Sequence, residues 1–425
     1  MAVDAPLTAL FIDCDSFFAS VEQHLDPSLR GKPVGVAPVM AETSCCIAAS
    51  YQAKSFGIKT GTSVRDARIL CPGIRIVESK PSEYVKIHHR IIEAVESCIH
   101  VEAVLSIDEM WAWLPTNWRE PDFVLGLGRR IKETVCTEIG EEVKVSVGAA
   151  PNKYLAKMAT KMGKPDGLFV IRSHELPEVL HGLELRDLTG IAKNMEARLH
   201  SAGIHTVEAL CAAPKQVLHG VWGGVLGNRL WHLLRGDVMP DLVSSRKSIG
   251  HSHVLPPDKR SPAKAWPILC KLLHKACERL RSHGLLTGSL TVQLAFLRDG
   301  SWSPELRFPE TDSTFLLVRH LQRLWSDRTD PRANLIQVGV VLSRFVDSDN
   351  HTPDLFQNQV MDAMSTDDDK LARLDETIDR LRMRYGRQVV FFGSVQNHRD
   401  SAPMRISFTH IPDLALEDDH RLGQG

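Results

Sequence analysis

The order in which strand-like and helix-like segments follow one another is the feature that most constrains how this chain can fold. Up to residue 170, short apolar runs alternate with amphipathic helical patterns, whereas residues 183–235 are almost entirely helical in pattern. Residues 246–346 then follow the order β-α-β-β-α-β, a known supersecondary pattern. Because 425 residues exceed what one core usually supports, we expect an α+β protein with about two to four domains.

The composition is that of an ordinary folded protein and excludes several classes. Apolar residues make up 43% of the chain and charged residues 24%. The sequence has no apolar run long enough for a transmembrane helix, so we expect no membrane partner. The start of the chain lacks the basic residues of a signal peptide, and the nine cysteines form no CxxC pair. We therefore expect reduced thiols in a cytosolic protein, rather than a disulfide scaffold or a zinc site.

The charge is unevenly distributed along the chain. Residues 347–425 carry a net charge of −6, and the residues before them carry a net charge of +5. A mildly basic body with an acidic tail fits a nucleic-acid partner only weakly. A solvated surface of mixed charge explains these numbers equally well.

Four carboxylates are the candidates for chemistry. Asp13 closes an apolar run and is followed by Asp15, while Asp108 and Glu109 lie between two short apolar runs that predict a hairpin. Carboxylates at strand ends are natural ligands for Mg²⁺, and three of them can hold two ions about 3.5–4 Å apart. Each acid taken alone is more simply explained as a solvated turn residue.

Six sequence blocks give these carboxylates a context. The blocks are Phe11–Glu22, Ala49–Gly61, Ser106–Glu109, Pro151–Lys157, Gly163–Gly167 and Arg246–His251. With these blocks the chain resembles the Y-family DNA polymerases of the DinB/UmuC/ImpB-MucB-SamB type, and they occur in the order of that family over residues 7–346.

The resemblance implies the fold of a right-hand polymerase. Its expected parts are a palm, fingers, a helical thumb with a helix-hairpin-helix turn, a β-α-β-β-α-β little finger and a C-terminal extension. In this sequence they correspond to residues 1–18 and 73–167 (palm), 19–72 (fingers), 168–236 (thumb), 237–245 (linker), 246–346 (little finger) and 347–425 (extension or tail).

The resemblance also implies an activity. A polymerase of this family copies a template with low fidelity past DNA damage, in bacterial DNA repair, mutagenesis and the SOS response. It transfers a dNMP to a primer 3′-hydroxyl by two-metal nucleotidyl transfer. Asp13, Asp108, Glu109 and the backbone carbonyl of Cys14 would ligate two Mg²⁺ ions, for which Mn²⁺ can substitute. Asp15 would be structural support, and the protein would work in the cytoplasm, at the nucleoid.

The residues implied to contact the incoming dNTP are Phe17, Phe18, Tyr51, Lys54 and Lys164. Phe18 would be the steric gate that rejects a 2′-hydroxyl, although an aromatic residue is by default simply core. The family usually has Arg in place of Lys54, and Lys cannot form a bidentate fork on phosphate.

Two further departures concern the fingers. Ala48 replaces a frequent Thr, which removes one hydroxyl contact to phosphate, and Thr62-Ser63 replaces a Met-Pro pair. Neither departure touches the implied metal ligands.

The implied partners are primer–template DNA, the sliding clamp and other repair proteins. Gly190 and Ala192 fall in the helix-hairpin-helix turn, whereas Arg246, Lys247, Ser248 and Arg344 would hold the DNA backbone. The last strand of the little finger carries little charge, so we expect modest DNA affinity and low processivity. Leu355 and Phe356 partly resemble clamp-docking peptides, but the leading Gln is missing. A tail that packs these two residues on its own domain is the alternative.

Two other functions stay open at this point. A non-catalytic relative that binds DNA as a scaffold of a mutagenesis complex would keep the domains but lose metal carboxylates. A palm-fold nucleotide cyclase, or another nucleotidyltransferase without a template, would leave the thumb-like and little-finger-like blocks without a purpose. The sequence has no GxxxxGK[ST] loop and no HExxH motif, which excludes P-loop ATPases and zincins.

Overall fold

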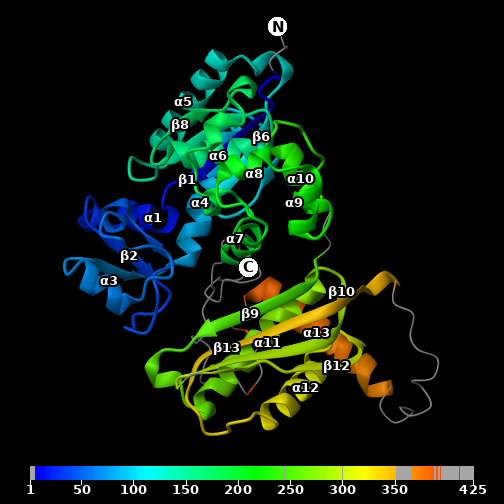
Figure 1. Cartoon of the computed structure of the whole chain (residues 1–425). Helices are drawn as coiled ribbons and strands as arrows, with labels where there is room; N and C mark the ends of the chain where they lie inside the picture. Colours follow the sequence, from blue (N-terminus) through cyan, green and yellow to red (C-terminus); the bar gives the residue numbers. More distant parts are fainter. Residues whose placement is uncertain are drawn as a thin grey trace.

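The computed structural model describes residues 5–242, 246–298, 300–350 and 365–386, together with residues 389, 390, 393 and 411. We keep the expected names palm, fingers, thumb and little finger for its four parts. Figure 1 shows the little finger as a sheet with helices below the other three parts, and its Arg260 guanidinium donates to the Thr43 hydroxyl of the fingers at 2.6 Å.

The palm is a five-stranded sheet with the order β5-β6-β1-β7-β8. β1 lies at its centre and pairs antiparallel with both β6 and β7, while β8 is parallel to β7. All six residues of β1 are buried, which is why the strand reads as a continuous apolar run before Asp13. The strands are β1 (Ala9–Cys14), β5 (Ala103–Val104), β6 (Glu109–Trp113), β7 (Val145–Ala150) and β8 (Leu168–Val170).

Helices cover both faces of the palm sheet. Successive residues of β1 point to opposite faces, so Leu10, Ile12 and Cys14 belong to one core, whereas Ala9 and Phe11 belong to another. The first core includes residues of α4 (Pro81–Glu96) and α5 (Pro121–Glu138). The second includes α6 (Lys153–Gly163) and the thumb helices, so palm and thumb share one continuous core.

The fingers have a small sheet of their own, ordered β3-β2-β4, and a separate small core. β4 pairs parallel with β2, so this sheet reaches beyond residue 72, where the sequence-based boundary lies. α1 joins β1 to the fingers and spans the residues that the sequence pattern predicts. The elements are α1 (Phe17–Leu25), β2 (Val34–Ala37), β3 (Ala48–Ala49), α2 (Tyr51–Lys54), α3 (Val64–Leu70) and β4 (Arg75–Glu78).

The thumb is helical, as its sequence predicts. Short 3₁₀ helices at Ser173–Glu175, Glu178–Leu180 and Leu185–Asp187 lead into it. Its α-helices are α7 (Lys193–Ser201), α8 (Val207–Ala212), α9 (Lys215–Trp222) and α10 (Val225–Leu233).

The little finger follows the predicted β-α-β-β-α-β order, with its third strand divided in two. β11 and β12 both pair with β10, and the other pairs are β10 with β13 and β13 with β9. α11 and α12 contribute to a core that is separate from that of the palm. The elements are β9 (Ser248–Val254), α11 (Pro262–Ser282), β10 (Leu285–Phe296), β11 (Ser301–Trp302), β12 (Glu305–Thr311), α12 (Thr314–Ser326) and β13 (Leu335–Asp347).

A helix from the expected tail packs onto the little finger. This helix, α13 (Ser365–Tyr385), lies beside α11 in Figure 1. The Arg281 guanidinium of α11 donates to both carboxylate oxygens of Asp379, at 2.7 and 3.0 Å. The buried carboxylate of Asp375 accepts the backbone N–H of Thr314, at the start of α12, at 2.8 Å. At least this part of residues 347–425 is therefore an added layer of the little finger.

The same contact region makes the stability of the little finger dependent on pH. His274 in α11 is buried, and burial, with the nearby Arg382 and Arg281, lowers its pKa to about 3. The unfolded chain takes up this proton below about pH 6.5, whereas the folded protein does not. The free energy of unfolding is therefore not reduced by His274 above about pH 6.5, and it decreases as the pH falls below this value.

We predict that replacing His274 with Leu flattens this pH dependence. Between pH 7 and pH 5, the wild type should lose about 2 kcal/mol of unfolding free energy relative to His274→Leu. Urea unfolding at the two pH values measures the difference, with the exposed His219→Leu as the control variant. An equal loss in wild type and His274→Leu would contradict the assignment.

Candidate active site

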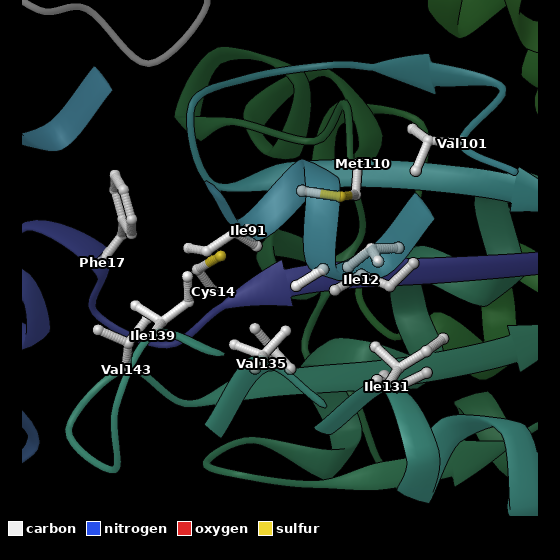
Figure 2. Packing of buried hydrophobic residues seen from close by; sticks show 14 of the residues in the cluster. Ile12, Cys14, Phe17, Ile91, Val101, Met110, Ile131, Val135, Ile139 and Val143 are labelled. Atoms are coloured by element: carbon white, nitrogen blue, oxygen red, sulfur yellow. The ribbon is translucent and has the colours of Figure 1, made fainter. Parts of the chain in front are cut away.

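The end of β1 separates two neighbouring side chains. The Asp13 side chain lies on the same face of β1 as Phe11, toward α6. The Cys14 side chain points into the opposite core, among Ile12, Ile91 and Met110 (Figure 2). Burial raises the pKa of the Cys14 thiol, so a thiolate ligand is disfavoured and the backbone carbonyl is the group that Cys14 can offer.

The hairpin places the second and third carboxylates beside Asp13. Glu109 is the first residue of β6 and stands directly opposite Asp13 in the antiparallel ladder. Asp108 lies in the preceding turn, where its carbonyl accepts the Cys14 N–H at 2.8 Å and its side chain accepts the Ser106 hydroxyl. The bend at this turn lets two adjacent acids approach the same strand end, a condition that regular strand geometry alone does not meet.

Two lysines face these carboxylates. Lys157 of α6 pairs with Glu109 at 2.7 Å, and Lys164, just beyond α6, pairs with Asp13 and lies 3.8 Å from Asp15. Burial raises the pKa of Asp13 to about 6, because the effect of Lys164 is outweighed by burial together with Asp108 and Glu109. Burial would lower the pKa of Lys164, but the nearby carboxylates raise it overall. The site thus holds more negative charge than its two lysines relieve.

The donor set suits a hard divalent cation. Asp13, Asp108 and Glu109 supply oxygen atoms, the ligand type that Mg²⁺ prefers. In the part of the chain that the structure describes, no three His, Cys, Asp or Glu side chains stand at metal-binding distances from a common point. Two of the three acids, Asp13 and Glu109, are instead paired with Lys164 and Lys157.

The fingers bring two predicted nucleotide contacts to the same strand end. Tyr51 and Lys54 lie on α2, whose N-terminus is capped by the Ser50 side chain. The Tyr51 hydroxyl donates to Asp15 at 3.2 Å, and the Lys54 ammonium donates to the Ser16 hydroxyl at 2.7 Å. Burial, followed by the charge of Lys164, lowers the pKa of Lys54. Tyr51, Lys54 and Lys164 therefore converge on residues 13–16.

The rings of Phe17 and Phe18 in α1 pack against Tyr84 of α4. Phe18 is 2% exposed and stacks on Tyr84, with ring centroids 4.7 Å apart, and Phe17 contacts the edge of Tyr84. The Tyr84 hydroxyl donates to the fully buried Glu22 at 2.7 Å. A ring buried to this degree agrees with a core aromatic, and the steric gate stays a prediction.

Sequence reasoning did not single out Lys157, Ser146, Ser16 or Tyr84. Lys157 could have been found, because Lys153, Lys157 and Lys161 repeat every four residues along one face of α6. The Ser146 hydroxyl donates to Asp15 at 2.8 Å. It reaches the site because the sheet register places Ser146 opposite Asp13 in β7. No local signal in the sequence carries that information.

The expected DNA contacts lie away from the carboxylates, in the thumb and little finger. Gly190 has φ 93° and Ala192 caps α7, and both are exposed in the predicted turn. Arg246, Lys247 and Ser248 are exposed at the start of β9.

Arg344 is exposed in β13 and has the unusual φ of 58°, beside the place where the pairing of β10 with β12 shifts its register. Leu355 and Phe356 lie outside the described residues. Among the helices of the described segments, none combines the length and apolar character needed to cross a bilayer.

A central antiparallel sheet with acids at a strand end, lysines facing them, a helical thumb and a separate sheet domain define a polymerase of the right-hand class. Comparison with known proteins specifies the family. The model of the impB/mucB/samB family matches residues 12–161, and that of the family's C-terminal domain matches residues 246–355.

Curated relatives match nearly the whole chain. DNA polymerase IV of Moorella thermoacetica is 35% identical over 400 residues, covering 91% of this chain and 96% of the relative. DNA polymerase IV of Pelotomaculum thermopropionicum is 31% identical, covering 89% and 92%.

Solved structures agree with these relatives. The chimera titled "Y-family DNA polymerase chimera Dbh-Dpo4(243-245)-Dbh" has a TM-score of 0.67 at 26% identity, covering 80% of this chain and 99% of that one. The chain therefore belongs to the impB/mucB/samB family of Y-family DNA polymerases. It is a DNA-directed DNA polymerase of the translesion type.

The pairing of lysines with carboxylates predicts how Mg²⁺ affects stability. Replacing Lys164 with Met should lower the stability of the metal-free protein by about 1–3 kcal/mol, because it leaves the buried Asp13 carboxylate without its partner. Added Mg²⁺ should then raise the melting temperature more in Lys164→Met than in the wild type. Thermal melts with and without Mg²⁺ measure both effects.

The matched control is Lys161→Met, because Lys161 donates to the backbone carbonyl of Asp187 and not to a carboxylate. Equal Mg²⁺ shifts in Lys164→Met and Lys161→Met would show that the carboxylates are not where the metal acts.

Proposed function

We propose that this chain extends a primer along a template by two-metal nucleotidyl transfer, with the low fidelity of a translesion enzyme. One observation carries the proposal. The register of β1 with β6 brings Asp13 and Glu109 side by side next to Asp108, and cationic side chains from the fingers and from the end of α6 face this strand end. Charge arranged in this way suits a triphosphate bound through metal ions.

Asp13, Asp108, Glu109 and the carbonyl of Cys14 would hold two Mg²⁺ ions, for which Mn²⁺ can substitute. When bound, these ions would lower the pKa of the primer 3′-hydroxyl and neutralise the triphosphate and the leaving pyrophosphate. Burial, with a smaller contribution from the charges of Asp108 and Glu109, raises the pKa of Asp13, and a bound cation would stabilise the ionised carboxylate. The chain needs no nucleophile of its own for this reaction.

Tyr51, Lys54 and Lys164 would hold the triphosphate. All three already contact residues 13–16, so they surround the place where the phosphates would meet the metal ions. Lys54 offers a point charge where the family usually offers a bidentate guanidinium. The buried Ala48 in β3 offers no hydroxyl. We expect weaker nucleotide binding than an Arg and Thr pair would give.

Primer–template DNA would lie against the thumb and the little finger. Helices pack on one face of the little-finger sheet. The other face carries small or uncharged residues, such as Ser252, Thr291, Gln293 and Gln337, together with the ion pair of Glu305 and Arg307 in β12. Such a face suits contact with a DNA backbone held at the side by Arg246, Lys247, Ser248 and Arg344, and by Gly190 and Ala192 of the thumb. Few charges on this face agree with modest DNA affinity and low processivity.

The remaining partners are also proposals. The relatives named DNA polymerase IV are bacterial, which supports work in the bacterial cytoplasm at the nucleoid. Docking of Leu355 and Phe356 on a sliding clamp, and recruitment of other repair proteins, rest on the sequence alone.

Primer extension tests the carboxylates directly. With primer–template, dNTPs and Mg²⁺, the wild type should extend the primer, whereas Asp108→Ala/Glu109→Ala should lose at least about 10³-fold in rate because it removes two of three metal ligands. Chelation of Mg²⁺ should abolish extension by the wild type. DNA binding of the double variant should persist, because the expected DNA contacts lie elsewhere. If neither protein extends the primer while both bind DNA, the non-catalytic scaffold would replace this proposal.

Sugar selection tests Phe18. Replacing Phe18 with Ala should raise ribonucleotide incorporation relative to deoxyribonucleotide incorporation by about 10²-fold, because it removes the ring that would clash with a 2′-hydroxyl. Single-nucleotide insertion kinetics with matched dNTP and NTP measure the ratio. Phe17→Ala is the neighbouring control and should change the ratio far less. A role in the core alone would lower stability in both variants without changing the ratio.

A further inference from the structure

Asp15 is the most heavily bonded carboxylate of the site, although the proposed chemistry gives it no task. It is 2% exposed. One carboxylate oxygen accepts the Ser146 hydroxyl at 2.8 Å and the Asp166 backbone N–H at 2.7 Å, and the other accepts the Tyr51 hydroxyl at 3.2 Å. Asp15 therefore joins three segments that are far apart in the sequence: a strand of the palm, the turn after α6 and the fingers.

The turn after α6 depends on Asp15 and Ser146. The Ser146 hydroxyl donates to Asp15 and accepts the Gly167 N–H at 3.2 Å, so the two side chains hold consecutive N–H groups of this turn. Asp166 has φ 51°, in the left-handed region that non-glycine residues seldom adopt. A Cβ atom on Gly167 would lie 1.8 Å from the Gly163 carbonyl oxygen, so the turn is closed tightly. A turn of this shape needs fixed hydrogen-bond partners.

This turn determines the direction of the Lys164 side chain. Lys164 begins the turn, and its ammonium returns to Asp13 and lies 3.8 Å from Asp15. On the other side, Tyr51 reaches Asp15 from the fingers. The same buried carboxylate thus fixes two of the three side chains proposed to hold the triphosphate.

The bonding also separates Asp15 from the proposed metal ligands. Both of its oxygens already accept hydrogen bonds from neutral groups of the chain, whereas Asp13 and Glu109 are paired with the ammonium groups of lysines. Releasing Asp15 to a metal ion would leave the Asp166 N–H and the Ser146 hydroxyl without their acceptor in a buried place, which is costly.

We propose that Asp15, supported by Ser146, is a positioning residue that sets Tyr51 and Lys164 for the triphosphate of the incoming nucleotide. The inference rests on the proposed function, since it assumes that a dNTP binds here. It gives Asp15 a definite role in nucleotide affinity, beyond general support of the fold.

The first experiment measures dNTP affinity without turnover. A primer ending in a dideoxynucleotide, annealed to its template, is bound in Ca²⁺, and the dNTP concentration needed to form the ternary complex is measured. Asp15→Asn should raise the dNTP Kd by about tenfold, because it removes the negative charge beside Lys164 and reverses the hydrogen bond to the Tyr51 hydroxyl when its one oxygen faces Ser146 and Asp166. The concentration of Mg²⁺ that half-saturates primer extension should stay unchanged, unlike in Asp13→Asn.

The second experiment uses a matched pair at Ser146, which keeps the proposal testable if Asp15→Asn fails to fold. Thr and Val have the same shape, but only Thr keeps the hydroxyl. Ser146→Val should raise the dNTP Kd about threefold to tenfold relative to Ser146→Thr at a similar melting temperature. Thr160→Val removes a buried hydroxyl that bonds only carbonyls within α6, and it should leave the Kd unchanged.

A double-mutant cycle tests the route through Lys164. Once Lys164→Ala has removed the ammonium group, adding Ser146→Val should raise the dNTP Kd by less than about twofold. The reason is that the turn then positions no ammonium group for the triphosphate.

Three results would overturn the inference. The first is an unchanged dNTP Kd in Asp15→Asn and Ser146→Val. The second is a change in Mg²⁺ requirement in Asp15→Asn as large as in Asp13→Asn, which would make Asp15 a metal ligand. The third is full additivity of Lys164→Ala and Ser146→Val. A wild type that binds primer–template but neither binds nor incorporates dNTPs would instead contradict the proposed function.

Discussion

The antiparallel pairing of β1 with β6 and β7 is the interaction on which the site depends. In this register Glu109, Asp13 and Ser146 form one row across three strands and point to the same face of the sheet. A shift of β1 by one residue would turn Asp13 into the apolar core and bring Cys14 to the site. The buried residues on both faces of β1 prevent that shift, because each face packs against its own set of helices. The core of the palm therefore specifies the geometry of the chemistry.

The site combines acids and lysines whose charges offset one another only in part. Asp13 and Glu109 are paired with Lys164 and Lys157, yet burial and mutual repulsion still raise the pKa of Asp13 to about 6. We propose that bound metal ions neutralise the carboxylates. The two lysines would then pair with the phosphates of the triphosphate instead of with the carboxylates. Palm and thumb share one core, and Val36 and Ala48 of the fingers belong to the other core of the palm, whereas the little finger has a core of its own. The little finger can therefore adjust to DNA without disturbing the carboxylates.

Much of the fold could be predicted from the sequence, because local patterns determine it. Helix Phe17–Leu25 and the β-α-β-β-α-β order follow from apolar periodicity and turn residues. The position of Asp13 at a strand end, and of Asp108 and Glu109 at a hairpin, also follows from the sequence. Tyr51, Lys54 and Lys164 were named only through the family resemblance. The sequence could not place Ser146 or define the task of Asp15, since both depend on pairing between distant segments. The docking of α13 was missed for a similar reason, because its anchors, Asp375 and Asp379, read as an acidic exposed face until Arg281 and Thr314 are brought against them.

The central claim, that the end of β1 holds two catalytic metal ions, is tested most directly by counting them. Mn²⁺ bound per chain can be measured by electron paramagnetic resonance in a complex with a dideoxy-terminated primer, its template and the matching dNTP. The account predicts about two Mn²⁺ per wild-type complex and a loss of at least one in Asp108→Asn/Glu109→Gln. An equal count in both proteins would contradict it, because the metal ions would then be held by the nucleotide or DNA and not by these carboxylates.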